Sequence, residues 1–365
     1  MNKGCMIMTL SRILGFQKIS YLKFTDGANN MKKEEFYFQW HFMNSCNLRC
    51  AHCYQEGYHY EDLPLDKLMQ IGNQIVTALR KWNMLGRISL TGGEPFLSPH
   101  ILTLVDFLEK SDEIKQFDIL TNGTCITDEH INALIKSKKL HQIQISLDGP
   151  TEESHDSVRG EGTFNKVLKT IKKLQEHDIE VSFMFTLMRQ NKEYAIQIID
   201  FAEQCNVNAV TVERVTPCGH SSLADVLSKE EIKDIYEGIT LRANSINSKL
   251  TVRRLRPLWI NTAHLDCTNN EKIGGFCPVG LTSLAILWDG TVLPCRRLEI
   301  PIGNILEEGL FKIWYDSDVL WKIRDKNNLK GKCHGCVNIE RCGGCRAIAY
   351  ETTGDYMEED IQCWI

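Results

Sequence analysis

The sequence predicts an α/β protein, a partial (β/α)6 TIM-like barrel followed by a small cysteine-rich domain. Two observations support this fold class. From residue 36 to about 220, short apolar runs alternate with amphipathic helical stretches, a pattern typical of parallel strands joined by right-handed crossovers. After Cys277 the sequence changes to short strands, turns and closely spaced cysteines. Six strand–helix units are too few for a closed barrel of eight, so we expect an incomplete one.

Short apolar runs predict the strands, and apolar residues recurring three or four positions apart predict the helices. The predicted strands are Phe36–Phe42, Arg87–Leu90, Gln116–Leu120, His141–Leu147, Glu180–Leu187 and Ala209–Arg214. The predicted helices are Leu65–Trp82, Ile101–Lys110, Asp128–Ser137, Phe164–His177, Glu193–Gln204 and Ser228–Asn247. In such folds, functional residues gather at the carboxyl ends of the strands.

The chain of 365 residues has room for one large domain and a smaller one. We expect an N-terminal extension over residues 1–34, with Met31 as an alternative start, and the barrel over residues 35–225. A linker or helical bridge is expected over residues 226–276, and the cysteine-rich domain over residues 277–365.

Composition and charge exclude several classes of partner. The net charge of −5 gives no reason to expect nucleic acid or an anionic membrane surface. No apolar run approaches the roughly 18 residues that a membrane-spanning helix needs. The 15 cysteines are an odd number, and we recognise no secretory signal, so a disulfide framework is not expected. A cytoplasmic protein with metal-bound cysteines is the expectation.

Cys46, Cys50 and Cys53 lie on one short loop directly after the first predicted strand. Three thiolates can bind three irons of a cubane cluster, whereas an ordinary [4Fe–4S] cluster takes four cysteines. The fourth iron would be open to a non-protein ligand, which suits reductive cleavage of a bound cofactor. A zinc site needs a fourth ligand, and His52 lies too near two of the cysteines in sequence to complete a tetrahedron comfortably. The pattern favours an iron–sulfur cluster.

The arrangement Cys46-x3-Cys50-x2-Cys53, followed by Tyr54, resembles the signature of the radical S-adenosylmethionine (SAM) superfamily. The resemblance implies an enzyme that cleaves SAM to methionine and a 5′-deoxyadenosyl radical, which abstracts hydrogen from substrate. Further segments resemble the family in the same order: Thr91-Gly92-Gly93-Glu94-Pro95, Thr121-Asn122-Gly123, Ser146-Leu147-Asp148-Gly149 and Arg159-Gly160.

By this resemblance, Glu94 would contact the methionine amino group, Ser146 and Arg159 would hold the carboxylate, and Asp148 would lie near the ribose. Glycines let the backbone approach a ligand closely, and arginine matches a carboxylate bidentately. The residues expected to bind SAM are Tyr54, Gly92, Gly93, Glu94, Asn122, Ser146, Asp148 and Arg159.

The C-terminal cysteines resemble the SPASM extension, which carries two auxiliary [4Fe–4S] clusters. Seven cysteines are too many for one zinc ribbon, although a structural zinc module is the alternative. By resemblance, auxiliary cluster I, nearer the active site, would be held by Cys277, Cys295 and Cys345. Its fourth ligand is Cys267 or no residue of the chain, in which case one iron stays open. The ligands of auxiliary cluster II would be Cys333, Cys336, Cys342 and Cys363.

The implied cofactors are SAM and three [4Fe–4S] clusters, with a reductant such as flavodoxin or ferredoxin. We expect a peptide or small-molecule substrate, foremost a ribosomally made peptide that is oxidatively modified or crosslinked. Two segments resemble the corresponding sequence of peptide maturases: Phe38-Gln39-Trp40-His41 and His52-Cys53-Tyr54-Gln55. The segment before the barrel is too short for the leader-binding domain of many such enzymes. A separate leader-binding protein would present the peptide, or the barrel would bind it unaided.

Two other functions stay open. Modification of a tetrapyrrole side chain, in the haem or haem d1 pathway, is the alternative, because Cys342-Gly-Gly-Cys345-Arg346-Ala347 resembles those enzymes. Five arginines could bind its carboxylates or lie at the surface: Arg253, Arg254, Arg256, Arg296 and Arg297. A non-enzymatic iron–sulfur electron carrier is less consistent with the SAM-binding segments. No general base is assigned, although Glu213 and Asp289 are conceivable.

Overall fold

A curved sheet of ten strands organises the chain, in the order β12-β11-β10-β1-β2-β3-β4-β5-β6-β7. The structure is a computed structural model that describes residues 33–55, 57, 62–246, 248–253, 259–260, 273–274, 277–340 and 342–365. Its first seven strands are parallel neighbours: β1 Glu35–His41, β2 Leu85–Thr91, β3 Ile114–Thr121, β4 Leu140–Ser146, β5 Val181–Leu187, β6 Ala209–Arg214 and β7 Thr251–Arg253.

The C-terminal region extends this sheet. Strand β10 (Ser283–Ile286) pairs in parallel with β1, and β11 (Thr291–Leu293) and β12 (Gly303–Asn304) continue it antiparallel. Strands β8 (Trp259–Ile260) and β9 (Ile273–Gly274) form a separate antiparallel pair.

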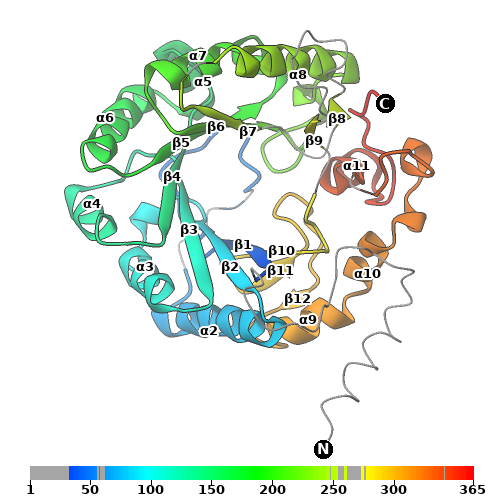
Figure 1. Ribbon diagram of the computed structural model, residues 1–365, viewed down its shortest axis with the longest axis horizontal. Helices are drawn as coiled ribbons and strands as arrows, with labels where there is room; N and C mark the ends of the chain where they lie inside the picture. The colour runs from blue at the N-terminus through cyan, green and yellow to red at the C-terminus, as the bar shows by residue number, and fades with distance from the viewer. Residues whose placement is uncertain are drawn as a thin grey trace, which may run out of the picture. The chain divides into compact units, whose positions relative to one another are not determined.

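Helices cover the outer face of the curved sheet (Figure 1). The α-helices of the first part are α2 Leu65–Trp82, α3 Ile101–Lys110, α4 Asp128–Leu134, α5 Glu152–Arg159, α6 Thr163–Gln175, α7 Gln197–Gln204 and α8 Lys229–Asn244. Those of the last part are α9 Leu310–Asp316, α10 Asp318–Arg324 and α11 Arg346–Thr353. The short 3-10 helices are η1 Pro95–Leu97, η2 Arg189–Tyr194, η3 Leu223–Asp225, η4 Lys326–Asn328 and η5 Gly331–Cys333.

The core lies between the sheet and these helices. Helix α2 buries Leu68, Ile71 and Ile75, which recur at helical spacing and turn one face to the sheet. In β1, alternate residues are fully buried, and Phe36 stacks on Trp82 with ring centroids 4.9 Å apart. Each such buried apolar side chain contributes about 1.5–3 kcal/mol. This packing fixes the strand ends where the site is built.

The predicted six-unit α/β barrel is confirmed, and most predicted strands and helices lie within a few residues of the observed ones. Three features were not predicted. Helix α5 was missed because its sequence is mostly polar. The cysteine-rich region was predicted as strands and turns, yet it contains α9, α10 and α11. Strand β10 joins the barrel sheet, which is a long-range pairing that local pattern does not encode.

The chain divides into two units after Lys33, and the elements described here belong to the second, Glu34–Ile365. The predicted boundaries near residues 225 and 276 stay predictions. Among the described residues, no helix combines the length and apolar character needed to cross a membrane.

Candidate active site

A cavity of about 430 Å³ opens at the carboxyl ends of the parallel strands. Each of five consecutive strands contributes a lining residue at or next to its last position: Thr91, Thr121, Ser146, Thr186 and Arg214. The lining also includes the segments around Cys277, Cys295 and Cys345. The cavity therefore lies where α/β folds place their ligands.

Cys46, Cys50 and Cys53 line this cavity together. Their loop is held close to the sheet, because a Cβ on Gly93 would lie 2.1 Å from the carbonyl oxygen of Ser45. Three N–H donors point at the sulfurs: the Leu48 amide lies 3.4 Å and Asn122 Nδ2 4.0 Å from Cys46 Sγ, and Arg159 Nη1 lies 3.6 Å from Cys50 Sγ. Donors directed at sulfur are typical of cysteines that bind iron–sulfur clusters.

Two thiols of this group are buried enough to shift their pKa. Burial raises the pKa of Cys46 to about 12 and also raises the pKa of Cys50. Without a cation they would stay protonated, and a metal centre supplies the charge that deprotonates them. In the described part of the chain, no three His, Cys, Asp or Glu side chains are close enough to hold a single metal ion. That these three thiols bind separate irons of one cluster stays a prediction.

Cys277, Cys295 and Cys345 line the same cavity. Burial, followed by the proximity of Cys295 and Cys345, raises the pKa of Cys277 to about 12. The buried Ser283 also lines the cavity. Cys267, the predicted alternative ligand, lies outside the described residues.

A third group, whose thiols lie close enough to affect one another's pKa, consists of Cys333, Cys336, Cys342 and Cys363. Burial raises the pKa of Cys342 to about 11, with further contributions from Cys363 and Cys333. Amide N–H groups lie 3.5 Å from the sulfurs of Cys336 and Cys342, and Arg346 Nη2 lies 3.9 Å from Cys333 Sγ. This group has the same kind of sulfur-directed donors as the first.

Six of the eight residues predicted to bind SAM line the cavity: Tyr54, Gly92, Gly93, Asn122, Ser146 and Arg159. The other two are acids buried behind that lining. Glu94 accepts hydrogen bonds from Thr121 Oγ1 (2.7 Å) and the Asn122 amide (2.8 Å). Burial raises the pKa of Glu94, and those hydrogen bonds oppose the rise. Its contact with the SAM amino group stays a prediction.

Asp148 is the second buried acid, and it joins the cluster loop to helix α5. Its Oδ2 lies 2.6 Å from Arg159 Nε and 2.8 Å from His52 Nε2. Burial acts to raise the pKa of Asp148, but Arg159 and His52 hold it well below its usual range. The carboxylate is therefore a charged support for both side chains.

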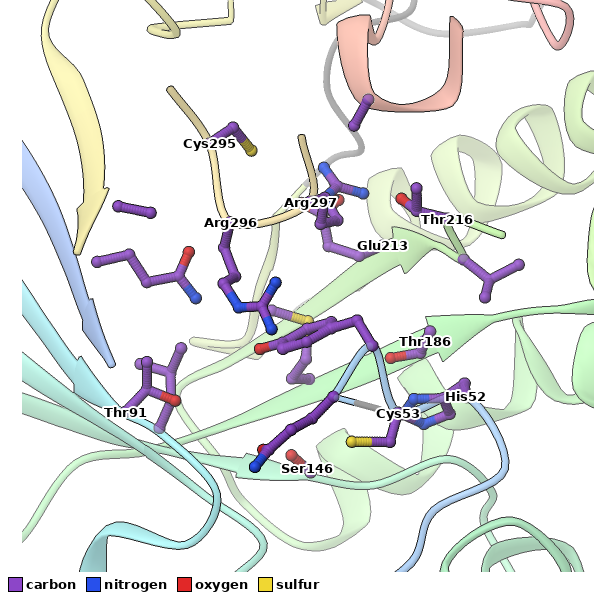
Figure 2. Close-up of a pocket in the computed structure, with 18 of the residues that line it drawn as sticks. His52, Cys53, Thr91, Ser146, Thr186, Glu213, Thr216, Cys295, Arg296 and Arg297 are labelled. Atoms are coloured by element: carbon purple, nitrogen blue, oxygen red, sulfur yellow. Dashed lines mark ion pairs between the residues drawn. The ribbon is translucent and has the colours of Figure 1, made fainter. Parts of the chain in front are cut away.

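Two arginines that line the cavity, Arg296 and Arg297, are each paired with a carboxylate. The Arg296 guanidinium stacks 4.1 Å from the centroid of Tyr54 and pairs with Glu299. Arg297 Nη2 lies 3.2 Å from Glu213 Oε2 at the end of β6. Figure 2 shows both arginines extending from the loop of Cys295, with Cys53 on the other side of the space.

None of the other three arginines that could bind substrate carboxylates is among the described residues that line the cavity. Arg253 lies in β7, and Arg254 and Arg256 lie outside the described residues. Asp289, a conceivable base, accepts hydrogen bonds from the amide and hydroxyl of Thr291 in the β10–β11 turn. The sequence reasoning missed Asp360, which binds Arg214. Nothing in the sequence distinguishes it from the neighbouring Glu358 and Glu359.

Sequence comparison identifies the class of protein. The radical SAM superfamily profile matches residues 40–202, and the SPASM iron–sulfur cluster-binding domain profile matches residues 277–337. The chain thus contains a radical SAM domain, followed by a C-terminal SPASM domain. These domains imply SAM and [4Fe–4S] clusters as cofactors.

Individual relatives differ in their named roles. An AdoMet-dependent heme synthase from Methanosarcina barkeri is 28% identical over 354 residues, covering 89% of this chain and 95% of the relative. Mycofactocin maturase MftC from Mycolicibacterium smegmatis is 26% identical over 341 residues, covering 89% and 81%. The SAM-bound structure of SuiB from Streptococcus suis superposes with a TM-score of 0.72 at 20% identity, covering 91% of this chain and 78% of SuiB. The last likeness concerns the fold.

Proposed function

We propose that this protein is a radical SAM oxidoreductase that abstracts hydrogen from a peptide substrate and oxidises it with three [4Fe–4S] clusters. The observation that carries the proposal is that two groups of three cysteines line one cavity, with Cys295 and Cys53 on opposite sides of it (Figure 2). A substrate between them would lie near the radical source on one side and an electron acceptor on the other.

The residues fit the proposed cofactors. Cys46, Cys50 and Cys53 would hold the SAM-cleaving cluster and leave one iron for SAM. SAM and this cluster, when bound, supply the carbon radical that abstracts hydrogen. Gly92, Gly93, Asn122, Ser146 and Arg159 would line the SAM site, and Glu94 and Asp148 would support it from behind.

The C-terminal cysteines would hold the auxiliary clusters. Cys277, Cys295 and Cys345 would bind auxiliary cluster I at the cavity, with Cys267 as the candidate fourth ligand. Cys333, Cys336, Cys342 and Cys363 would bind auxiliary cluster II farther from it. An external reductant such as flavodoxin or ferredoxin would supply electrons, and a separate leader-binding protein is a candidate partner.

The charge balance of the cavity supports a peptide substrate. Five arginines line it, and four are paired with carboxylates: Arg159 with Asp148, Arg214 with Asp360, Arg296 with Glu299 and Arg297 with Glu213. In each pair the carboxylate neutralises the arginine, so the cavity attracts a polyanion only weakly. Glu213 lines the cavity and is our candidate to accept the proton that an oxidised substrate releases.

A second candidate substrate is a tetrapyrrole carboxylate. The observation that favours it is the likeness to the AdoMet-dependent heme synthase along nearly its whole length. Binding would require the arginines of the cavity to exchange their internal carboxylates for those of the ligand.

The cofactor assignment is tested by metal analysis of the anaerobically reconstituted protein, with zinc measured on the same sample. Three cubanes predict about twelve irons per chain. Near four irons together with zinc would show that the C-terminal module is structural and would reject the oxidative mechanism. Replacing Cys46, Cys50 and Cys53 with alanine should abolish SAM cleavage and leave the auxiliary iron. Cleavage by that variant would reject the assigned active cluster.

A further inference from the structure

Arg159 contacts the first cysteine group at a sulfur atom. Its Nη1 lies 3.6 Å from Cys50 Sγ, and both residues are at least nine-tenths buried. Arg159 is the last residue of helix α5. The same helix end accepts a hydrogen bond of 2.9 Å from the Ala51 amide at the Val158 carbonyl. The contact therefore belongs to a wider junction between α5 and the cluster loop.

The orientation of the guanidinium is fixed from behind. Asp148, fully buried, binds Arg159 through Nε at 2.6 Å, which leaves the two Nη groups directed at the loop. Arg159 Nη2 lies 3.4 Å from His52 Nε2. The second carboxylate oxygen of Asp148 accepts the Thr186 amide at 2.9 Å, so the acid is itself held by strand β5.

This arrangement has an electrostatic consequence for a cluster held by Cys50. The positive end of the Arg159–Asp148 pair faces the sulfur, and the negative end points away from it. A buried positive charge and an N–H donor at a cluster sulfur both stabilise the reduced state, which carries one more electron. The midpoint reduction potential should therefore be higher than that of the same cluster without this contact.

We propose that Arg159 is a positioning residue that raises the reduction potential of the SAM-cleaving cluster through Cys50, in addition to lining the SAM site. The proposal rests on the proposed function, because it requires a cluster on Cys46, Cys50 and Cys53. It differs from a role confined to the SAM carboxylate, because the contact is made with the sulfur of Cys50 itself.

The test is an EPR-monitored redox titration of the reconstituted full-length protein in the absence of SAM. The signal that later responds to added SAM identifies the active cluster. In Arg159→Gln we expect its ratio of reduced to oxidised form at a fixed potential to fall on the order of tenfold, about 59 mV for one electron. Arg49→Gln is the matched control, because Arg49 is an exposed arginine of the same loop that donates to backbone carbonyls.

An unchanged potential in Arg159→Gln, with weaker SAM binding alone, would overturn the proposal, and so would an equal shift in Arg49→Gln. If Arg159→Gln loses the cluster, selective ¹⁵N-arginine labelling provides a second measurement. Pulsed EPR of the reduced active cluster should detect an arginine nitrogen coupling in the wild type that is absent from Arg159→Lys. No such difference would also overturn the proposal. Failure of the proposed function is distinguishable, because it shows in the metal analysis of the wild type or as SAM cleavage by the triple alanine variant, and neither result depends on Arg159.

Discussion

Arg214 and Asp360, which are 146 residues apart in sequence, form a buried bidentate ion pair. Arg214 Nη1 lies 3.1 Å from Asp360 Oδ1, and Nη2 lies 2.8 Å from Oδ2. Arg214 ends strand β6, while Asp360 also accepts the Cys345 amide at 2.9 Å. The pair thus connects the barrel to a proposed ligand of auxiliary cluster I.

Asp360→Asn should destabilise the protein strongly, because it leaves the buried Arg214 without its counter-charge. Removing one partner of a buried ion pair typically costs about 3–5 kcal/mol. The measurement is the midpoint of thermal unfolding at equal iron content. Burial favours the neutral acid, but Arg214 holds the pKa of Asp360 below its usual range, so the charge is present at neutral pH.

Asp128→Asn is the matched control for this experiment. Asp128 pairs with Lys173 at 2.7 Å, yet its side chain is 77% exposed. Exposed ion pairs contribute little to stability, so the midpoint should hardly move. Equal effects of the two substitutions would contradict the special role of Arg214–Asp360.

Gly219→Ala should dislodge the active-cluster loop. Gly219 has φ of +63°, and an added Cβ would lie 2.4 Å from the Cys53 carbonyl oxygen. The adjacent His220 amide donates to that oxygen at 2.8 Å. Neither the oxygen nor the backbone can move without moving Cys53. We therefore expect the variant to lose about four irons per chain, one cubane. It should also lose the ability to cleave SAM.

The control for this loss is Gly162→Ala, at φ of +73° with nothing within 4 Å of the added Cβ. It introduces backbone strain of about 1–2 kcal/mol without a clash. Iron content should stay at the wild-type value. Retention of all iron by Gly219→Ala would show that the loop tolerates displacement.

Local features of this site could be predicted from the sequence, whereas long-range ones could not. The loop of Cys46 and the strand ends could be predicted from cysteine spacing and hydrophobic periodicity, because both depend only on residues that are near in sequence. The pairing of β10 with β1 and of Arg214 with Asp360 depends on tertiary packing between distant segments. The direction of Glu94, which turns toward Thr121 behind the cavity wall, depends on neighbouring loops that the motif does not specify.

Acidification should destabilise the fold through His155. Burial, and then the nearby Arg159, lower the pKa of His155 to about 4, and the neutral Nδ1 accepts the Asp148 amide at 3.3 Å. The unfolded chain has the ordinary histidine pKa of about 6.5. Between pH 6.5 and 4 the unfolded state binds more protons, so stability is complete above this window and falls on acidification.

The maximum loss from this one group is about 3 kcal/mol, at about 1.4 kcal/mol per pH unit. His155→Gln keeps an acceptor for the Asp148 amide and removes the titration. The dependence of the unfolding midpoint on pH between 6.5 and 4 should be shallower in this variant. A slope identical to that of the wild type would show that His155 is protonated equally in both states.

Glu213→Gln should change the ligand preference of the cavity, because Glu213 is the carboxylate among the described residues that line it. Its removal leaves Arg297 without the partner that lies 3.2 Å away. A tetracarboxylate porphyrin should then bind about tenfold more tightly, equivalent to about 1.4 kcal/mol. Porphyrin absorbance titrations of the wild type and of the variant measure this difference, and Glu308→Gln, in an exposed pair with Lys312, is the control.

Weak binding by the wild type and a gain only in Glu213→Gln would support the balanced cavity and the peptide substrate. Tight binding by the wild type, unaffected by Glu213→Gln, would contradict that balance and favour the tetrapyrrole as substrate.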